Sequence, residues 1–330
     1  MIVDLIGGSG FIGTRFAKRL KLQPKFKIKI IDKAISNTFP ELVSLADIRS
    51  VDQLRKSVSQ NSVIVHLAAE HRDDISDLDL YAEVNVGGAK NICTVATEKG
   101  VNTIVFTSTV AIYGFAPIGT DESGRVAPFN EYGKTKYEAE LVFKAWQAAL
   151  PKERALIIIR PTVVFGERNR GNVFNLLKQI SSGKFVMVGN GLNRKSMAYV
   201  GNVAAFLEYS LNFKSGVHVY NYVDKPDFTM NTLVSHVNKL LGKSYKIKFR
   251  LPFAIGLLIG LSFDLVAKIS GKKFPISAIR VKKFCANSVY ESAVGSTDFK
   301  PPIPLMEAIE KTVRFEFIED HKTEQVFYSE

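Results

Sequence analysis

The sequence has few of the features that mark a secreted or metal-binding protein. Its 330 residues include two cysteines, too few for a disulfide framework, which fits a reducing compartment. A strand-like run, Ile2 to Ile6, follows Met1 directly, so we expect no signal peptide and a cytoplasmic chain. His66 and His71 lie five positions apart, unlike helical zinc ligands, so we predict no metal site.

Long apolar runs are also scarce. The uncharged stretch Leu251 to Phe263 has 13 residues, whereas a transmembrane helix needs about 20. Basic residues flank it on both sides: Lys246, Lys248 and Arg250 before it, and Lys268, Lys272 and Lys273 after it. Two interpretations stay open. The stretch is either a buried core helix with a solvated basic flank or an interfacial segment drawn to anionic lipid.

The positive charge is concentrated around this stretch. The chain has 44 basic and 32 acidic residues, a formal net charge of +12. Residues 239–283, here called the basic window, hold eleven Lys and Arg against one acid, Asp264. These side chains flank leucine and isoleucine rather than aromatic residues suited to stacking on bases, so no nucleic acid is expected. The charge favours an anionic membrane surface or a phosphorylated substrate.

The pattern of the first half predicts an α/β fold. With 46% hydrophobic residues the chain can form a packed core. Strand-like runs alternate with helical patterns at 14–22, 80–99 and 132–149, and the runs lie at 2–6, 27–31, 42–46, 62–67, 103–108 and 155–160. We therefore predict a Rossmann-type doubly wound parallel sheet over residues 1–165. Residues 166–330 are expected to form a smaller, partly discontinuous substrate lobe, with 200–225 returning to the sheet and about 239–283 facing a membrane.

A glycine-rich turn after the first strand indicates a dinucleotide site. Gly7, Gly10 and Gly13 lie in the sequence GGSGFIG, where a helix N-terminus can face a pyrophosphate. Asp32 ends the second strand, 19 residues after Gly13, where a carboxylate can accept hydrogen bonds from the adenosine ribose. A 2'-phosphate would be repelled there, so NAD is expected rather than NADP, although Lys33 beside it weakens this preference.

A Tyr and a Lys one helical turn apart indicate general base chemistry. Tyr132 and Lys136 would project from one helix face, and a nearby cation would lower the tyrosine pKa and make the phenol a usable base. Thr107, Ser108 and Thr109 close the fifth strand, at the edge where such sheets bind ligands.

With these motifs the chain resembles the extended short-chain dehydrogenase/reductase superfamily of NAD-dependent sugar epimerases and dehydratases. STVAIYG at 108–114, YGKTK at 132–136 and RPTVVFG at 160–166 carry the resemblance over nearly the whole chain. It implies that Lys136 binds the nicotinamide ribose, and that Thr109 and Tyr132 hold the sugar hydroxyl. The residues expected to bind NAD are Gly7, Gly10, Phe11, Ile12, Gly13, Asp32, Lys33, Asp47, Ile48, Leu67, Ala68, Ala69, Asn85, Thr107, Tyr132, Lys136 and Pro161.

Departures from the superfamily pattern reduce the number of activities that we expect. Dehydratases carry Asp-Glu after the catalytic Thr, where this chain has Val110 and Ala111, so a 4,6-dehydratase is not expected. Val163, Asn202 and Lys195 replace residues of the usual uridine diphosphate grip. LAAEHRDD at 67–74 and the 160–180 segment are similar to enterobacterial O-antigen 4-epimerases that act on N-acetylglucosamine linked to UDP or to diphospho-undecaprenol. Our candidates for contacting the substrate diphosphate are Arg168, Arg170, Asn172 and Lys195.

The resemblance therefore implies an isomerase that interconverts N-acetylglucosamine and N-acetylgalactosamine, and the basic window favours diphospho-undecaprenol as the carrier, for lipopolysaccharide O-antigen synthesis. A UDP-N-acetylglucosamine 4-epimerase and a 4-ketosugar reductase remain alternatives, because they share every motif. A non-catalytic NAD-binding protein is disfavoured because Tyr132, Lys136 and Thr109 are all present. The resemblance implies a homodimer, and the basic window implies a peripheral position on the cytoplasmic side of the inner membrane.

Overall fold

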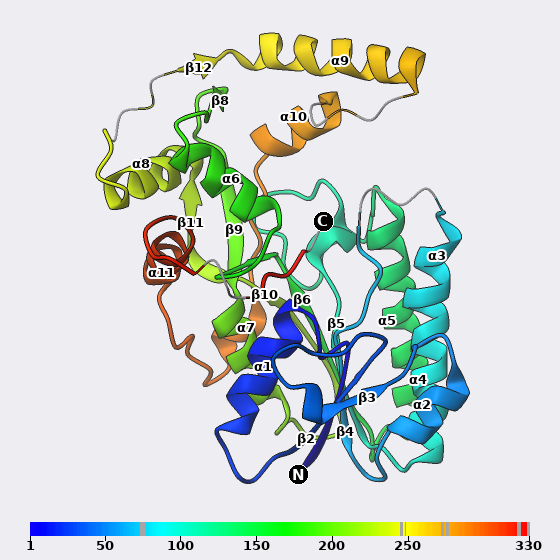
Figure 1. The fold of residues 1–330 in the computed structure, drawn as a ribbon. Coiled ribbons are helices and arrows are strands. Elements are labelled where there is room, and N and C mark those ends of the chain that lie inside the picture. The colour runs from blue at the N-terminus through cyan, green and yellow to red at the C-terminus, as the bar shows by residue number, and fades with distance from the viewer. Residues whose placement is uncertain are drawn as a thin grey trace.

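A parallel sheet between two helical layers forms the larger part of the molecule (Figure 1). The computed structural model describes residues 1–72, 77–244, 247, 249–271, 274, 277–321 and 325–328. Within them one sheet has seven strands, all parallel. In spatial order these are β10 (Gly216–Tyr222), β6 (Ala155–Pro161), β5 (Thr103–Thr107), β4 (Val63–His66), β1 (Ile2–Ile6), β2 (Lys27–Asp32) and β3 (Val43–Leu45). The predicted Rossmann-type α/β class is confirmed.

Each face of the sheet has its own apolar core. On one face α1 (Phe11–Lys21) and α7 (Val200–Ser210) bury side chains such as Phe16 and Phe206 against Val3, Leu5 and Ile157. On the other face lie α2 (Val51–Ser57), α4 (Gly88–Glu98) and α5 (Glu131–Ala149). The strands are buried on both faces, which explains their nearly continuous apolar runs.

Some predicted element boundaries were wrong. α1 begins at Phe11, three residues before the predicted start, because Gly10 has extended backbone and ends the glycine turn. The predicted helix over 80–99 consists of three pieces: α3 (Asp79–Tyr81), a π-helix η2 (Ala82–Gly87) and α4. Two short 3₁₀ helices, η1 (Pro40–Leu42) and η3 (Val110–Tyr113), lie in the loops that follow β2 and β5.

The second lobe lies above the carboxyl edge of the sheet in Figure 1. One of its sheets has three strands, in the spatial order β11 (Asp224–Thr229), β9 (Arg194–Tyr199) and β7 (Val163–Phe165). The other pairs β12 (Arg250–Leu251) with β8 (Met187–Val188). Its helices are α6 (Asn172–Ser181), α8 (Met230–Leu240), α9 (Phe253–Ser270), α10 (Ala278–Cys285), η4 (Ala293–Ser296) and α11 (Leu305–Phe317). α6, α8 and α11 share one core with β9.

The chain crosses between the two lobes more than once. After Pro161 it leaves the large sheet, and α7 and β10 then bring residues 200–222 back, with β10 paired to β6 over seven residues. Asp224 ties this return to the second lobe. Its carboxylate accepts hydrogen bonds from the backbone N–H of Tyr199, from Asn202 and from the Tyr222 hydroxyl. The domain boundary after residue 165 stays a prediction.

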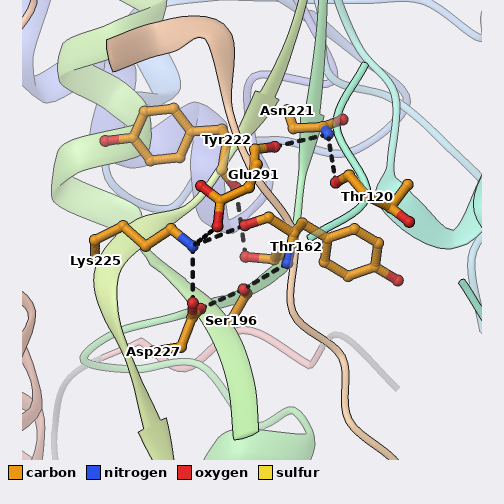
Figure 2. A network of polar contacts seen from close by, with 9 residues as sticks. Thr120, Thr162, Ser196, Asn221, Tyr222, Lys225, Asp227 and Glu291 are labelled. Atoms are coloured by element: carbon orange, nitrogen blue, oxygen red, sulfur yellow. Dashed lines mark hydrogen bonds and ion pairs between the residues drawn. The ribbon is translucent and has the colours of Figure 1, made fainter. Parts of the chain in front are cut away.

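A polar network fixes the end of β10 against the segment before η4 (Figure 2). The Lys225 ammonium donates to Asp227 at 2.7 Å and to Glu291 at 3.0 Å, and Ser196 donates to the other oxygen of Asp227. Asn221 donates to the carbonyl oxygens of Glu291 and Thr120, and the hydroxyl of Thr162 donates to the carbonyl of Tyr222. β9, β10 and β11 are thus joined by side-chain bonds besides their own ladders.

Helix α9 is barely covered by the rest of the described chain. It runs along the outer edge of the second lobe (Figure 1), and of its 18 residues only Gly256 and Gly260 are buried. A buried core helix, one of the two interpretations of the apolar stretch, is therefore wrong. The helix also continues beyond the 13 uncharged residues, so that by length and composition alone it could cross a bilayer. Lys246, Lys248, Lys272 and Lys273 lie outside the described residues.

Asp224 gives the folded state a measurable pH dependence. Burial raises its carboxyl pKa from 3.8 to about 6. Between about pH 4 and pH 6 the folded protein therefore holds a proton that the unfolded chain has released, so this contribution to stability is lost as pH rises. The loss is about 3 kcal/mol at most. Urea unfolding at pH 4 and pH 6 should show wild type losing stability relative to Asp224→Asn. The exposed Asp298→Asn is the control, and equal pH profiles for wild type and Asp224→Asn would contradict the assignment.

Candidate active site

The glycine turn is held against two neighbouring strand ends. Gly7 has φ +81°, and a side chain on it would meet the backbone of Ala68, so only glycine fits there. The backbone N–H of Ser9 donates to one oxygen of Asp32 at 3.0 Å, and its hydroxyl donates to the carbonyl of Ala34. The ends of β1, β2 and β4 are thereby fixed where the first turn of α1 begins.

This edge fits NAD. Most of the predicted cofactor residues lie at the carboxyl ends of strands, among them Asp32 (β2), Thr107 (β5) and Pro161 (β6). A Cβ on Gly10 would meet only the Gly7 carbonyl within 4 Å, so a ligand can approach the backbone closely. In the described part of the chain the Thr107 hydroxyl is buried without a hydrogen-bond partner, as expected for a group that a ligand satisfies.

The other predicted cofactor residues differ in how far they are buried and in whether another residue already binds them. Leu67, Ala68 and Ala69 follow β4 and are partly buried, whereas Lys33 is exposed beside Asp32. Phe11 and Ile12 open α1. After β3, Ile48 is buried and Asp47 accepts from Arg49, whose guanidinium holds the pKa of that carboxyl below its usual value. Their contacts with NAD stay predictions.

Asn85 acts through its neighbours in this structure. Its amide oxygen accepts from the Glu70 backbone N–H, and its amide nitrogen donates to the Glu70 carbonyl and to the Thr135 hydroxyl. Both amide N–H groups are thus used within the protein. Asn85 fixes the loop after β4 to α5, and a direct contact with the cofactor stays a prediction.

Tyr132 and Thr109 are brought together by the start of α5. Asn130 caps the helix by accepting the Gly133 N–H at 3.0 Å, and Gly133 lets the helix approach η3, where a Cβ would lie 2.7 Å from the Ala111 carbonyl oxygen. Loss of water around the Tyr132 phenol raises its pKa to about 12, and the neighbouring Thr109 side chain lowers it.

Lys136 does not lower the tyrosine pKa as expected. The lysine is 2% exposed, and its ammonium lies 4.2 Å from the centroid of the Phe106 ring. Burial lowers the Lys136 pKa to about 7, against a smaller opposing effect of Glu140. The sequence argument counted only the charge of Lys136, whereas burial destabilises the charged forms of both groups.

Glu140 is a buried acid next to the site residues that the sequence argument missed. It is fully buried, and its carboxylate accepts from the Ser108 hydroxyl at 2.6 Å and from Arg160 at 2.6 and 2.9 Å. Arg160 also donates to the Tyr113 hydroxyl. The available signal was an acid one helical turn after Lys136, on the face that carries the site. Glu140 positions Ser108, and with it Thr109, against α5.

The substrate candidates are dispersed and mostly paired. Arg170 forms a 2.8 Å ion pair with Glu316, and Glu316 also accepts the Arg168 backbone N–H. The ammonium of Lys195 donates to the carbonyls of Lys283 and Ala286 and to the Ser288 hydroxyl. Three acceptors occupy its three donors, so here it supports the end of α10. Asn172 is exposed at the start of α6. Contact of these four with a diphosphate stays a prediction.

The chain is similar to known sugar epimerases over its whole length. Residues 3–222 match the model of the NAD dependent epimerase/dehydratase family. A protein of Escherichia coli named N-acetyl-alpha-D-glucosaminyl-diphospho-ditrans,octacis-undecaprenol 4-epimerase is 47% identical, over 99% of each chain. UDP-glucose 4-epimerase of Vibrio cholerae is 28% identical over 81% of this chain and 84% of its own.

Solved structures of low sequence identity share the fold. UDP-glucose 4-epimerase of Thermus thermophilus in complex with NAD has a TM-score of 0.73 and 20% identity, covering 96% of this chain and 98% of its own. UDP-N-acetylglucosamine 4-epimerase of Methanobrevibacter ruminantium has a TM-score of 0.75 and 20% identity, covering 95% and 97%. With the glycine turn, Asp32 and the Tyr132–Thr109 pair in place, the chain belongs to the NAD-dependent epimerase/dehydratase family.

Proposed function

We propose that this protein is a 4-epimerase that interconverts N-acetylglucosamine and N-acetylgalactosamine on diphospho-undecaprenol. The observation that carries the proposal is the neighbouring pair Tyr132 and Thr109 in a nucleotide-binding fold, in a chain 47% identical from end to end to an enzyme of that name. The lipid-linked amino sugar would serve the synthesis of surface polysaccharide such as O-antigen.

Tyr132 is the proton carrier in this proposal. As the C4 alcohol is oxidised, the phenolate accepts the O4 proton, and it returns a proton to O4 when the 4-keto sugar is reduced on its other face. NAD held at the glycine turn would supply reversible hydride transfer at C4, so that no cofactor would be consumed. Thr109 holds O4 by a hydrogen bond, and Lys136 lies one turn along α5, where it can hold the ribose.

The exposed surface of helix α9 favours the hypothesis of a lipid-linked substrate. It presents large apolar side chains that a soluble sugar nucleotide would not need: Ile255, Leu258, Leu261, Leu265, Val266 and Ile269 are each at least 46% exposed. Arg250 precedes the helix, Lys268 lies in its last turn, and Lys282 and Lys283 lie on the adjacent α10. Apolar surface bordered by cations fits an anionic bilayer, at about 1 kcal/mol per basic residue near the surface.

The packing of α9 supports a helix lying in the membrane plane rather than crossing it. A side chain on Gly260 would meet the backbone of Ala278, and one on Gly256 would meet Val188, so α9 rests directly on α10 and β8. Asp264 accepts the Ala278 N–H at 3.0 Å. A spanning orientation would break these contacts and carry a charged carboxylate into the bilayer, which is costly. The proposed location is therefore peripheral, on the cytoplasmic side of the inner membrane.

Two other substrate schemes use the same residues. A UDP-N-acetylglucosamine 4-epimerase would leave the apolar face of α9 without a role, and a 4-ketosugar reductase would need NAD that exchanges in every cycle. Offering the enzyme N-acetylglucosamine on UDP and on undecaprenyl diphosphate, and measuring C4 inversion in each, separates the first scheme from ours. Inversion of the UDP sugar alone would contradict our proposal. A homodimer also stays a prediction, which analytical ultracentrifugation can test.

Replacing Tyr132 with Phe tests the proton carrier. The variant should keep its NAD but lose about 10²- to 10⁴-fold in turnover, because general base catalysis contributes that much. In wild type, turnover should increase as pH rises, because burial holds the Tyr132 pKa at about 12 and phenolate is the active form. Tyr137→Phe, in the same helix, is the matched control. Near wild-type turnover in Tyr132→Phe would contradict the assignment.

Replacing two leucines of α9 tests the membrane surface. Leu258 and Leu265 are 63% and 60% exposed. The double change Leu258→Glu and Leu265→Glu should weaken binding to vesicles of phosphatidylethanolamine and phosphatidylglycerol by at least about tenfold, because each buried leucine is worth about 1.5–3 kcal/mol. Co-sedimentation measures this. Leu141→Glu, at an exposed position of α5, should bind like wild type. Unchanged binding of the double variant would remove α9 from the membrane contact.

A further inference from the structure

The last described residues of the chain lie between the two lobes. In Figure 1 the last red segment of the chain lies in the middle of the molecule, close to the carboxyl edge of the large sheet. The Phe327 N–H donates to the carbonyl of Arg168 at 2.8 Å, and the Arg170 N–H donates to the carbonyl of Phe327 at 2.7 Å. Residues 325–328, here called the strap, therefore pair with the loop after β7.

The strap contacts two parts of the predicted cofactor edge. Phe327 is 9% exposed, and its ring centroid lies 5.9 Å from that of Phe11, the first residue of α1, which directly follows the glycine turn. The Thr38 hydroxyl donates to the side-chain oxygen of Gln325 at 3.3 Å. Thr38 lies six residues after Asp32, in the loop that follows β2. One short segment thus connects the glycine turn with the loop after the ribose-binding strand.

The loop that receives the strap is itself anchored. Glu316, near the end of α11, accepts the Arg168 N–H at 2.6 Å and pairs with the Arg170 guanidinium at 2.8 Å. Glu167 pairs with Arg15 of α1 and accepts the Tyr199 hydroxyl. Because this loop is fixed to both lobes, the strap holds Phe11 against a rigid support.

We propose that the strap retains NAD, with Phe327 as a positioning residue that acts through Phe11. The inference rests on the proposed function, because an epimerase returns the hydride it removes and gains nothing from releasing its cofactor between the two steps. Opening the glycine turn to release NAD would separate Phe327 from Phe11 and strip the strap from residues 168–170. The strap therefore slows NAD dissociation without contacting the reacting atoms.

Phe327→Ala tests this with a matched control at the next residue. Tyr328 is 75% exposed, so Tyr328→Ala removes an aromatic ring that does not pack against Phe11. Each full-length protein is loaded with radiolabelled NAD and chased with unlabelled NAD, and the dissociation rate is measured by filtration. An aromatic pair contributes about 0.5–1.5 kcal/mol, so Phe327→Ala should release NAD on the order of threefold to tenfold faster. Tyr328→Ala should match wild type, and Phe327→Leu should lie between them.

Two further measurements keep the proposal falsifiable. The urea midpoint of the NAD-free variants separates loss of the strap from loss of the fold, because a purely structural role would lower it without a selective effect on NAD release. Deletion of residues 325–330 should release NAD at least as fast as Phe327→Ala. Equal rates of NAD release by the deletion variant and wild type would overturn the proposal. Slower NAD release by the deletion variant would also overturn it, because the tail would then obstruct NAD binding rather than retain NAD. Failure of wild type itself to retain NAD would instead contradict the proposed epimerase.

Discussion

The buried carboxylate of Glu140 is the contact on which the rest of the site depends. It receives the Ser108 hydroxyl from the end of β5 and the Arg160 guanidinium from β6, while its own backbone belongs to α5. Through Arg160 the same network reaches Tyr113, which donates to Asn221 in β10. A buried ion pair of this kind is costly to break, because loss of one partner leaves the other charge unpaired in the core. The spacing of Thr109 and Tyr132 is therefore coupled to the attachment of β10.

Burial shifts both Tyr132 and Lys136 toward their neutral forms. It excludes water from the site, but it also disfavours phenolate at Tyr132 and ammonium at Lys136. The neighbouring Thr109 side chain and the carboxylate of Glu140 each offset part of this effect. The chain alone thus shifts both groups toward their neutral forms. Charge at this edge is more sensitive to what binds there than at a solvated helix surface.

Features that depend only on residues close together in the chain could be predicted from local patterns in the sequence. The glycine turn, Asp32 at the end of β2 and the Tyr132–Lys136 spacing follow from strand-turn-helix periodicity, and the structure puts them at one edge. Contacts between distant residues could not be predicted in this way. The partners of Glu140 lie 20 and 32 residues away, and the partner of Phe327 lies at the other end of the chain. The exposure of α9 could not be predicted either, because an apolar run has the same sequence pattern whether protein or lipid covers it.

The position of β10 sets an order in which the molecule can be made. The large sheet takes its edge strand from residues 216–222, beyond three strands of the second lobe in sequence. During synthesis β6 emerges first and exposes an unpaired, apolar edge until Tyr222 has left the ribosome. The nascent chain therefore cannot finish its nucleotide-binding sheet before it has begun the second lobe.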